Sequence, residues 1–198
     1  MEAISLGYNC SSATYGVENG MRKRKSQGYK TCPFDKIINN YEGMVQCIDD
    51  DFKYFCDTDY LELVHIPATS KWMNTDGDGD YIIYNTKYEF LFNHESPGYG
   101  HLFIDESWKG GKAHFINNNY AEFILRYERR IQNFRDYLNS GAHITFILTT
   151  KVKDTSALDS VLKKRYPTLE YTLRVLDAEE NYHDHMILLK LPKLQSTS

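Results

Sequence analysis

Cys10 is the side chain of this sequence whose type and position best suit chemistry. The segment from Ala3 to Gly7 predicts a short buried strand that turns at Gly7, and the next residues predict a helix that begins at Cys10 with Asn9 as its N-cap. Unpaired N–H groups and the positive end of the helix dipole favour a thiolate there, and a thiolate is a nucleophile. The alternative is a cysteine packed as a small apolar side chain.

A cysteine hydrolase also needs a base that takes and returns a proton, and donors for an oxyanion. N–H groups at the start of the helix can supply the donors. His94, just past an expected strand, can supply the base if the fold brings it within reach of the sulfur; otherwise it is an ordinary loop histidine. Asp35 or Glu95 can orient its ring, although an aspartate after Pro-Phe also caps a turn readily. His101 and His114 are alternative bases.

The composition is that of a folded protein with one core. The 198 residues are 41% hydrophobic and 14% aromatic, so we expect a single α/β domain over residues 1–194 followed by a polar tail at 195–198. The four cysteines show no Cys-x-x-Cys spacing, which indicates free thiols rather than a zinc ribbon or a redox pair.

Charge and hydropathy exclude several partners. The net charge of −4 gives no large basic field, so we expect no nucleic acid, although the basic patch from Arg22 to Lys25 is a possible contact for a phosphate or a partner. No apolar run has the length of a membrane span, and Met1-Glu2 does not resemble the start of a secretion signal. We therefore expect a cytoplasmic protein.

Periodicity in the last third of the chain predicts the elements that position these residues. Apolar side chains recur along one face of a long helix at Tyr120–Leu138. A strand at His143–Leu148, a helix at Ser156–Tyr166 and a strand at Leu169–Leu176 predict a right-handed βαβ unit, and His185–Leu191 predicts a last strand. With the opening strand beside them, these elements predict a single-domain sandwich whose mixed, partly parallel sheet is flanked by helices.

The first half of the chain predicts shorter elements. A helix begins near Asn40, and a turn or extended segment at Thr31–Ile38 precedes it. Three strands are expected, of which the last two form a hairpin that leads to His94; they are Leu61–Ile66, Tyr81–Asn85 and Tyr88–Phe92.

Several short motifs follow the order of a known family. They are Ser5-Leu6-Gly7 before Cys10, Cys32-Pro33-Phe34-Asp35-Lys36-Ile37, Tyr84-Asn85, Phe92-Asn93-His94 and Tyr127-Glu128-Arg129-Arg130-Ile131. In these motifs the chain resembles an uncharacterised family of bacterial and viral proteins labelled papain-like cysteine peptidases. The resemblance implies Cys10 as the nucleophile and His94 as its base. Such relatives often have Pro-Phe-Asp-Trp and His-Asp-Phe where this chain has Pro33-Phe34-Asp35-Lys36 and His94-Glu95-Ser96, so the group that orients the imidazole stays unidentified.

The lead hypothesis is therefore a hydrolase or acyl-transfer enzyme with a cysteine nucleophile, which acts on a peptide or acyl substrate without a cofactor. Its expected catalytic residues are Cys10, His94 and Asp35, and its expected substrate contacts are Asn9, Arg126 and Arg130.

A metal-dependent glycosyltransferase is the main alternative. Asp76, Asp78 and Asp80 alternate in a glycine-rich segment, and Asp-x-Asp oxygens can hold Mn²⁺ or Mg²⁺ against the diphosphate of a nucleotide sugar. Arg126, Arg129 and Arg130 are available for its phosphates. The spacing is not that of an EF-hand, because Lys87 stands where the final glutamate belongs. An acidic, glycine-rich surface turn is the commoner explanation for such a segment.

A non-catalytic binding module is the second alternative. Aromatic side chains that could form a recognition surface for carbohydrate or protein gather in the middle of the chain, namely Trp72, Tyr81, Tyr84, Tyr88, Tyr99 and Trp108. In such a module Cys10 would be dispensable.

Overall fold

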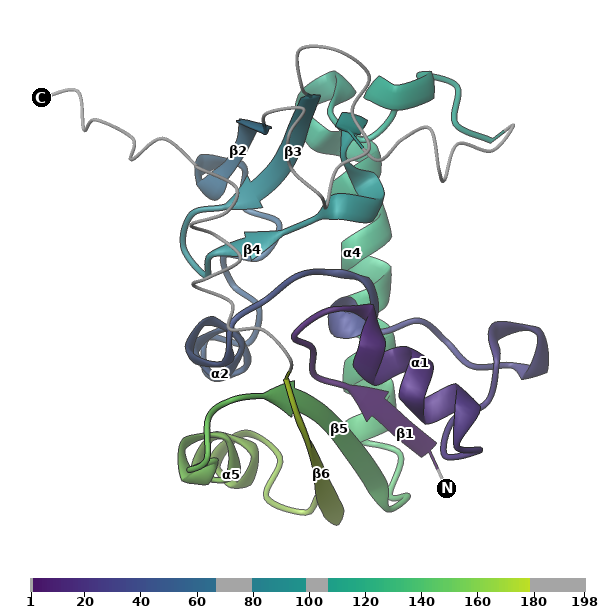
Figure 1. Cartoon of the computed structure of the whole chain (residues 1–198), viewed down its shortest axis with the longest axis vertical. Helices are drawn as coiled ribbons and strands as arrows, with labels where there is room; N and C mark the ends of the chain where they lie inside the picture. Colours follow the sequence, from purple (N-terminus) through teal and green to yellow (C-terminus); the bar gives the residue numbers. More distant parts are fainter. Residues whose placement is uncertain (1, 67–79, 99–106, 179–198) are drawn as a thin grey trace, which may run out of the picture.

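The computed structural model describes residues 2–66, 80–98 and 107–178, and its strands form two three-stranded sheets (Figure 1). The parallel sheet has the order β1-β5-β6, with β1 at Glu2–Ser5, β5 at Ile144–Thr150 and β6 at Tyr171–Asp177. The antiparallel sheet has the order β2-β3-β4, with β2 at Leu61–Ile66, β3 at Asp80–Asn85 and β4 at Phe90–Leu91. The predicted α/β class is confirmed, and the two kinds of strand pairing lie in separate sheets.

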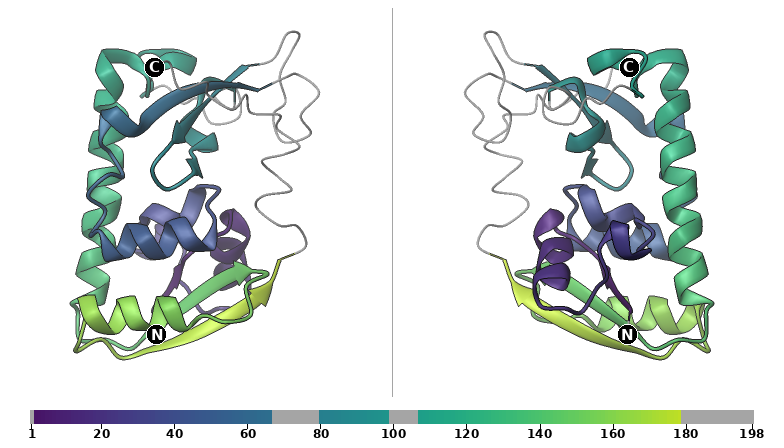
Figure 2. Two further views of the ribbon diagram at one scale, coloured as in Figure 1. Left: turned by 90° about the vertical axis from the view of Figure 1, so that its left-hand side faces the viewer. Right: turned by 90° about the vertical axis from the view of Figure 1, so that its right-hand side faces the viewer.

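The α-helices whose full bounds lie within the described residues are α1 (Cys10–Glu18), α2 (Tyr41–Asp49), α4 (Asn117–Leu138) and α5 (Ser156–Arg165), and they pack around these sheets. The helix α5 links β5 to its parallel neighbour β6, which confirms the βαβ unit. Figure 2 shows α4 upright along one side of the molecule, from the antiparallel sheet at the top to the parallel sheet at the bottom. None of the helices in the described ranges is long and apolar enough to cross a membrane.

The predicted hairpin is confirmed, but its second strand is shorter than Tyr88–Phe92. The side chain of Asn85 accepts the N–H groups of Lys87 and Tyr88, and Glu89 has a φ of +58°, so these residues form a turn before β4 begins. The segment around Asp35 is a 3₁₀ turn at Pro33–Lys36. The strand expected at 185–191 lies outside the described residues.

The predicted apolar stripe of α4 is buried in the main core, and its members are Phe123, Tyr127, Ile131, Phe134 and Leu138. Residues 118–120 have positive φ, and the regular helix follows them. One charged side chain, Arg130, is buried on the same face with 5% exposure. A cation in that position needs a buried anion.

Candidate functional site

The predicted strand, turn and helix around Cys10 are confirmed. Gly7 has a φ of +102°, which turns the chain out of β1, and the Asn9 side chain caps α1 by accepting the Ser11 N–H at 2.8 Å. The Cys10 side chain is exposed in the first turn of α1.

The end of β5 fixes this turn. The Gly7 carbonyl accepts the Thr149 N–H at 2.8 Å and also the hydroxyl of Ser12, which lies 2.7 Å from the Thr149 hydroxyl. On the other side, the Asn39 amide donates to the Leu6 carbonyl at 3.0 Å. The first turn of α1 is thereby tied both to the parallel sheet and to the segment before α2.

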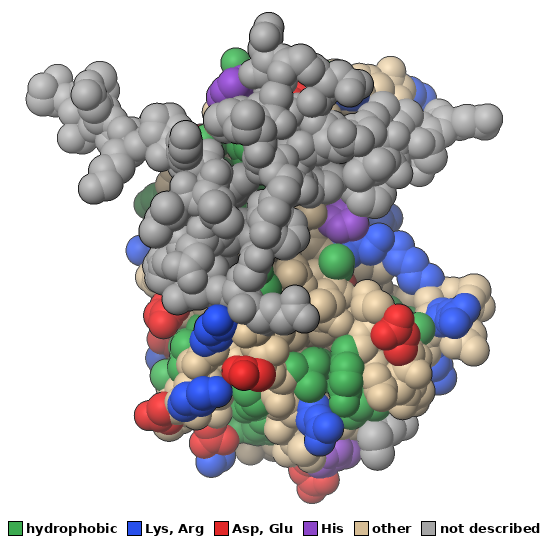
Figure 3. All heavy atoms as spheres, in the orientation of Figure 1, with side chains coloured by type: hydrophobic (Ala, Val, Ile, Leu, Met, Phe, Trp, Pro, Cys, Tyr) green, Lys and Arg blue, Asp and Glu red, His purple; other side chains and the backbone are tan. Residues whose placement is uncertain are grey.

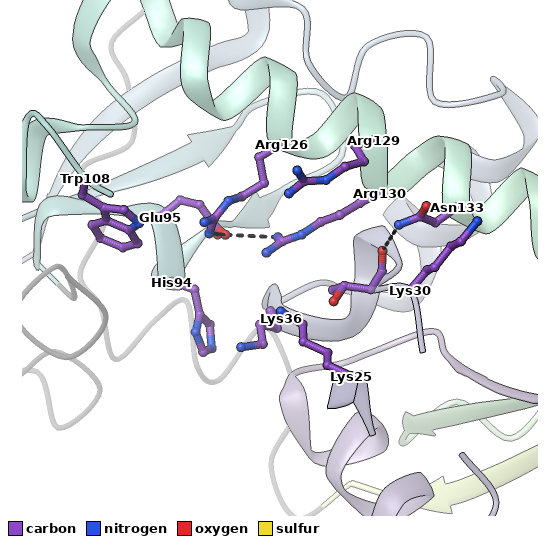
Figure 4. A pocket seen from close by; sticks show the side chains of 11 residues that line it. Lys25, Lys30, Lys36, His94, Glu95, Trp108, Arg126, Arg129, Arg130 and Asn133 are labelled. Carbon is purple, nitrogen blue, oxygen red and sulfur yellow. Dashed lines mark hydrogen bonds and ion pairs between the residues drawn. The ribbon is translucent and has the colours of Figure 1, made fainter. Parts of the chain in front are cut away.

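His94 lies in a short 3₁₀ turn, Asn93–Glu95, directly after β4. The Ser96 hydroxyl donates to the Phe92 carbonyl at 2.6 Å and accepts the Ile83 N–H at 2.7 Å, so the turn is bound to β3. His94 lines a cavity of about 530 Å³ between this turn, α4 and the chain from Lys25 to Lys36 (Figure 4).

Cys10 lines the neighbouring cavity, which has a volume of about 370 Å³. The two cavities share Lys25, Thr31 and Lys36 in their linings. The fold therefore brings the predicted nucleophile and the predicted base into adjacent cavities, although they are 84 positions apart in the sequence (94 minus 10). Cys32 and Cys47 are buried and Cys56 is half-buried, so Cys10 is the exposed thiol among the four free cysteines.

Burial lowers the pKa of His94 to about 4. The cations of Lys36, Arg130 and Arg126 act in the same direction, and the carboxylate of Glu95 opposes them. The imidazole is therefore neutral at neutral pH.

The lowered pKa of His94 predicts that the protein loses stability in mild acid. An unfolded histidine titrates near 6.5, so between pH 6.5 and 4 the unfolded state binds more protons than the folded one, and the free energy of unfolding should fall by at most about 3 kcal/mol as the pH drops through this window. Urea unfolding of His94→Gln at a series of pH values should lack this fall. His143→Gln, at an exposed histidine, should retain it; an unchanged slope in His94→Gln would contradict the prediction.

Glu95 is bound to arginines. Its Oε1 lies 3.0 Å from Arg126 Nη1 and 3.0 Å from Arg130 Nη1, and its Oε2 accepts the Tyr127 hydroxyl at 2.9 Å. Burial opposes the negative charge of Glu95, but Arg130 and Arg126 hold its pKa below the ordinary value. The sequence could have signalled this cluster, because Arg130 interrupts an apolar stripe of α4 at helical spacing.

Asp35 lines the cavity of Cys10 and is bound to another arginine. Its Oδ1 lies 2.6 Å from Arg22 Nη1 and 3.3 Å from the Tyr29 hydroxyl, and its Oδ2 accepts the Cys32 N–H at 2.8 Å. The described contacts of both candidate orienting carboxylates, Asp35 and Glu95, thus include arginine. Sequence reasoning did not find the pair of Arg22 with Asp35.

The structure describes only some of the residues on which the glycosyltransferase and binding-module hypotheses depend. Asp76 and Asp78 lie outside the described residues, whereas Asp80 opens β3 and its carboxylate accepts the Tyr81 N–H at 2.7 Å and lies 3.8 Å from Lys112 Nζ. Within the described ranges, no group of three or more His, Cys, Asp or Glu side chains could hold a metal ion.

The aromatic residues of the proposed recognition surface divide between core and surface. Tyr88 and Trp108 are buried, Tyr84 is half-buried and Tyr81 is 47% exposed. Trp72 and Tyr99, like the alternative base His101, lie outside the described residues, while His114 stacks on Trp108 at a ring distance of 5.8 Å.

Residues 1–180 match the model of a family described as "Putative papain-like cysteine peptidase (DUF1796)". A search of the curated proteins finds no significant match. A search of the solved structures also finds none. The matched range includes both Cys10 and His94 and most of the sequence, and the chain therefore belongs to this family.

Proposed function

We propose that the protein is a cysteine-nucleophile hydrolase or acyl-transfer enzyme in which Cys10 attacks and His94 is the base. The observation that carries the proposal is an exposed thiol in the first turn of a capped helix, in a cavity that shares three lining residues with the cavity of a neutral histidine. The family description names the same class of enzyme.

In the proposed reaction, the imidazole of His94 takes the proton of the Cys10 thiol as the sulfur bonds to a carbonyl carbon. The carbonyl electrons move to oxygen, where first-turn N–H groups of Cys10 and Ser12 would stabilise the charge. The C–N or C–O bond then breaks, the leaving group takes the proton from His94, and water or another acceptor releases the acyl group from sulfur.

The remaining predicted residues take supporting roles in this proposal. Asp35 is a positioning residue, because its ion pair with Arg22 and its bond to the Cys32 N–H stabilise the turn that ends in Lys36. Asn9 lines a further cavity of about 530 Å³ together with Cys10, and its side-chain amide is the donor we assign to the substrate.

The pH dependence of thiol alkylation tests the proposal. We expect iodoacetamide to label Cys10 faster than the other three cysteines, with a midpoint pH below the value of about 8.5 typical of a free thiol. His94→Ala should slow this labelling at neutral pH, and Cys10→Ala should abolish it, as read by mass spectrometry of digested protein. Labelling of Cys10 with an ordinary midpoint that His94→Ala does not change would contradict the proposal.

A metal-dependent glycosyltransferase is kept as the second candidate, because Arg126, Arg129 and Arg130 line one cavity, as phosphate binding would require. It predicts hydrolysis or transfer of a nucleotide sugar that depends on Mn²⁺ or Mg²⁺ and survives Cys10→Ala. A binding module predicts that ligand binding also survives this substitution, without any turnover.

A further inference from the structure

The cavity of His94 is strongly basic. Six Lys and Arg side chains and one carboxylate, Glu95, stand among the described residues that line it. The cations come from three separate parts of the chain: Lys25 and Lys30 follow α1, Lys36 ends the turn before α2, and Arg126, Arg129 and Arg130 project from α4 (Figure 4). Figure 3 shows Lys and Arg side chains gathered beside a histidine on the right of the molecule.

The one carboxylate leaves most of this charge uncompensated. Glu95 Oε1 forms ion pairs with both Arg126 and Arg130. Lys30 has a separate partner, because its Nζ lies 3.9 Å from Asp136. Among the described residues, no carboxylate forms an ion pair with Lys25, Lys36 or Arg129. Arg130 is 5% exposed, and its Nη1, although close to Glu95, makes no hydrogen bond of good geometry within the described part of the chain.

The positive potential lowers the pKa of two groups, Lys25 and His94, through the same three cations. Burial lowers the pKa of Lys25, and the neighbouring cations Lys36, Arg130 and Arg126 lower it further. The same three cations add to the effect of burial on the pKa of His94. A bound anion would oppose the contribution of these cations to both shifts.

We propose that this cavity binds the phosphate group of a small-molecule substrate. A phosphate dianion has two charges and several acceptor oxygens, which suits lysines and arginines that converge from several directions better than a single carboxylate does. The volume of about 530 Å³ lies in the range of small-ligand sites, and the concave form favours a compact ligand over a flat membrane surface. Assigning the phosphate to the substrate rests on the proposed function; phosphate binding itself does not.

The lining residues that the two cavities share indicate how a substrate with a phosphate group could reach Cys10. Lys25 and Lys36 line both the cavity of His94 and the cavity of Cys10. A substrate whose phosphate binds beside Arg129 and Arg130 can extend past these lysines toward the thiol. The phosphate would then anchor the substrate at a distance from the bond that Cys10 attacks.

Calorimetric titration of the whole protein with inorganic phosphate at pH 7.5 tests the site. We expect saturable binding of one phosphate, weakened about 5- to 10-fold by Arg129→Ala and by Lys36→Ala, since each removes one of the cations around the anion. Arg129 is exposed and Lys36 half-buried, so both variants should fold. Arg135→Ala removes a positive charge from the same helix outside this cavity and should leave the affinity unchanged.

An NMR titration of His94, assigned by comparison with His94→Gln, gives a second readout. Among the described residues, the charged groups that act on the imidazole are Glu95, Lys36, Arg126 and Arg130, and a dianion among these cations should raise its midpoint pH. Three outcomes would overturn the proposal: absence of saturable phosphate binding, an affinity in Arg129→Ala and Lys36→Ala equal to that of the unaltered protein, or glutarate binding as tightly as phosphate.

Cys10→Ser separates this proposal from the proposed function. The variant should bind phosphate as the unaltered protein does, because the sulfur does not line the basic cavity. If Cys10 proves unreactive while phosphate binds, the anion site stands without the enzyme. If Cys10 reacts as proposed and phosphate does not bind, only the anion site is overturned.

Discussion

Glu95→Ala is expected to lower the free energy of unfolding by about 3–5 kcal/mol, the usual effect of removing one partner from a buried ion pair. The Glu95 side chain is fully buried, and its removal would leave the buried guanidinium of Arg130 without its carboxylate and the Tyr127 hydroxyl without its acceptor. Arg126 would suffer less, because 26% of its side chain is exposed. Urea unfolding followed by circular dichroism would measure the change.

Glu128→Ala is the matched control, since it removes an exposed glutamate from α4 itself. We expect it to change stability by less than about 0.5 kcal/mol. Because the pKa of Glu95 is lowered in the folded state, the stabilisation from its charge should be complete above the unfolded value near 4.3 and should disappear as the pH falls further. If Glu95→Ala proved as stable as Glu128→Ala, the ion pairs of Glu95 would contribute nothing to the stability of the fold.

Gly7→Ala is expected to destabilise the protein by about 3 kcal/mol or more and to displace the thiol of Cys10. A Cβ at Gly7 would lie 1.8 Å from Asn39 Oδ1, and the φ of +102° is one that alanine rarely adopts. The Asn39 amide cannot retreat without losing its bond to the Leu6 carbonyl. Thermal unfolding and the alkylation rate of Cys10 would both report the change.

Gly20→Ala is the control that shows the cost of a positive φ without a steric clash. Gly20 also has a positive φ, +66°, but a Cβ there would meet nothing within 4 Å. We expect a loss of only about 1 kcal/mol and unchanged labelling of Cys10. Equal losses in the two variants would mean that the contact with Asn39 is unimportant.

The sequence predicts best those elements whose pattern is local. The 3.6-residue stripe of α4 and the strand-helix-strand spacing of β5, α5 and β6 are both confirmed. The expected place of the opening strand beside the C-terminal strands is confirmed, because β1 pairs with β5. The division into two sheets was not predicted, because a local pattern does not show which distant strands share a sheet. Strand propensity predicted a longer β4 than the structure has. The Asn85 side chain accepts two N–H groups of the turn, and these hydrogen bonds compete with strand pairing.

The sequence predicted the strand, turn and helix that hold Cys10. It did not predict which charged side chains meet around the candidate site. The residues around Gly7 and Asn9 determine where Cys10 lies, and all are within a few positions of it. By contrast, Glu95 meets Arg126 and Arg130 across more than 30 positions, and Lys36 joins them only through the fold. A sequence shows that such charges exist, but only tertiary structure decides which of them remain uncompensated.

The pairing of β1 also determines when the thiol site can form during synthesis. Residues 2–5 are synthesised long before their partners on β5, residues 144–147, and before Thr149, which forms the hydrogen bonds that hold Gly7 and Ser12. Contacts between such distant positions close late in folding. A nascent chain that has not reached residue 149 therefore carries Cys10 on an unanchored segment, and the position of the thiol is fixed only after β5 has been made.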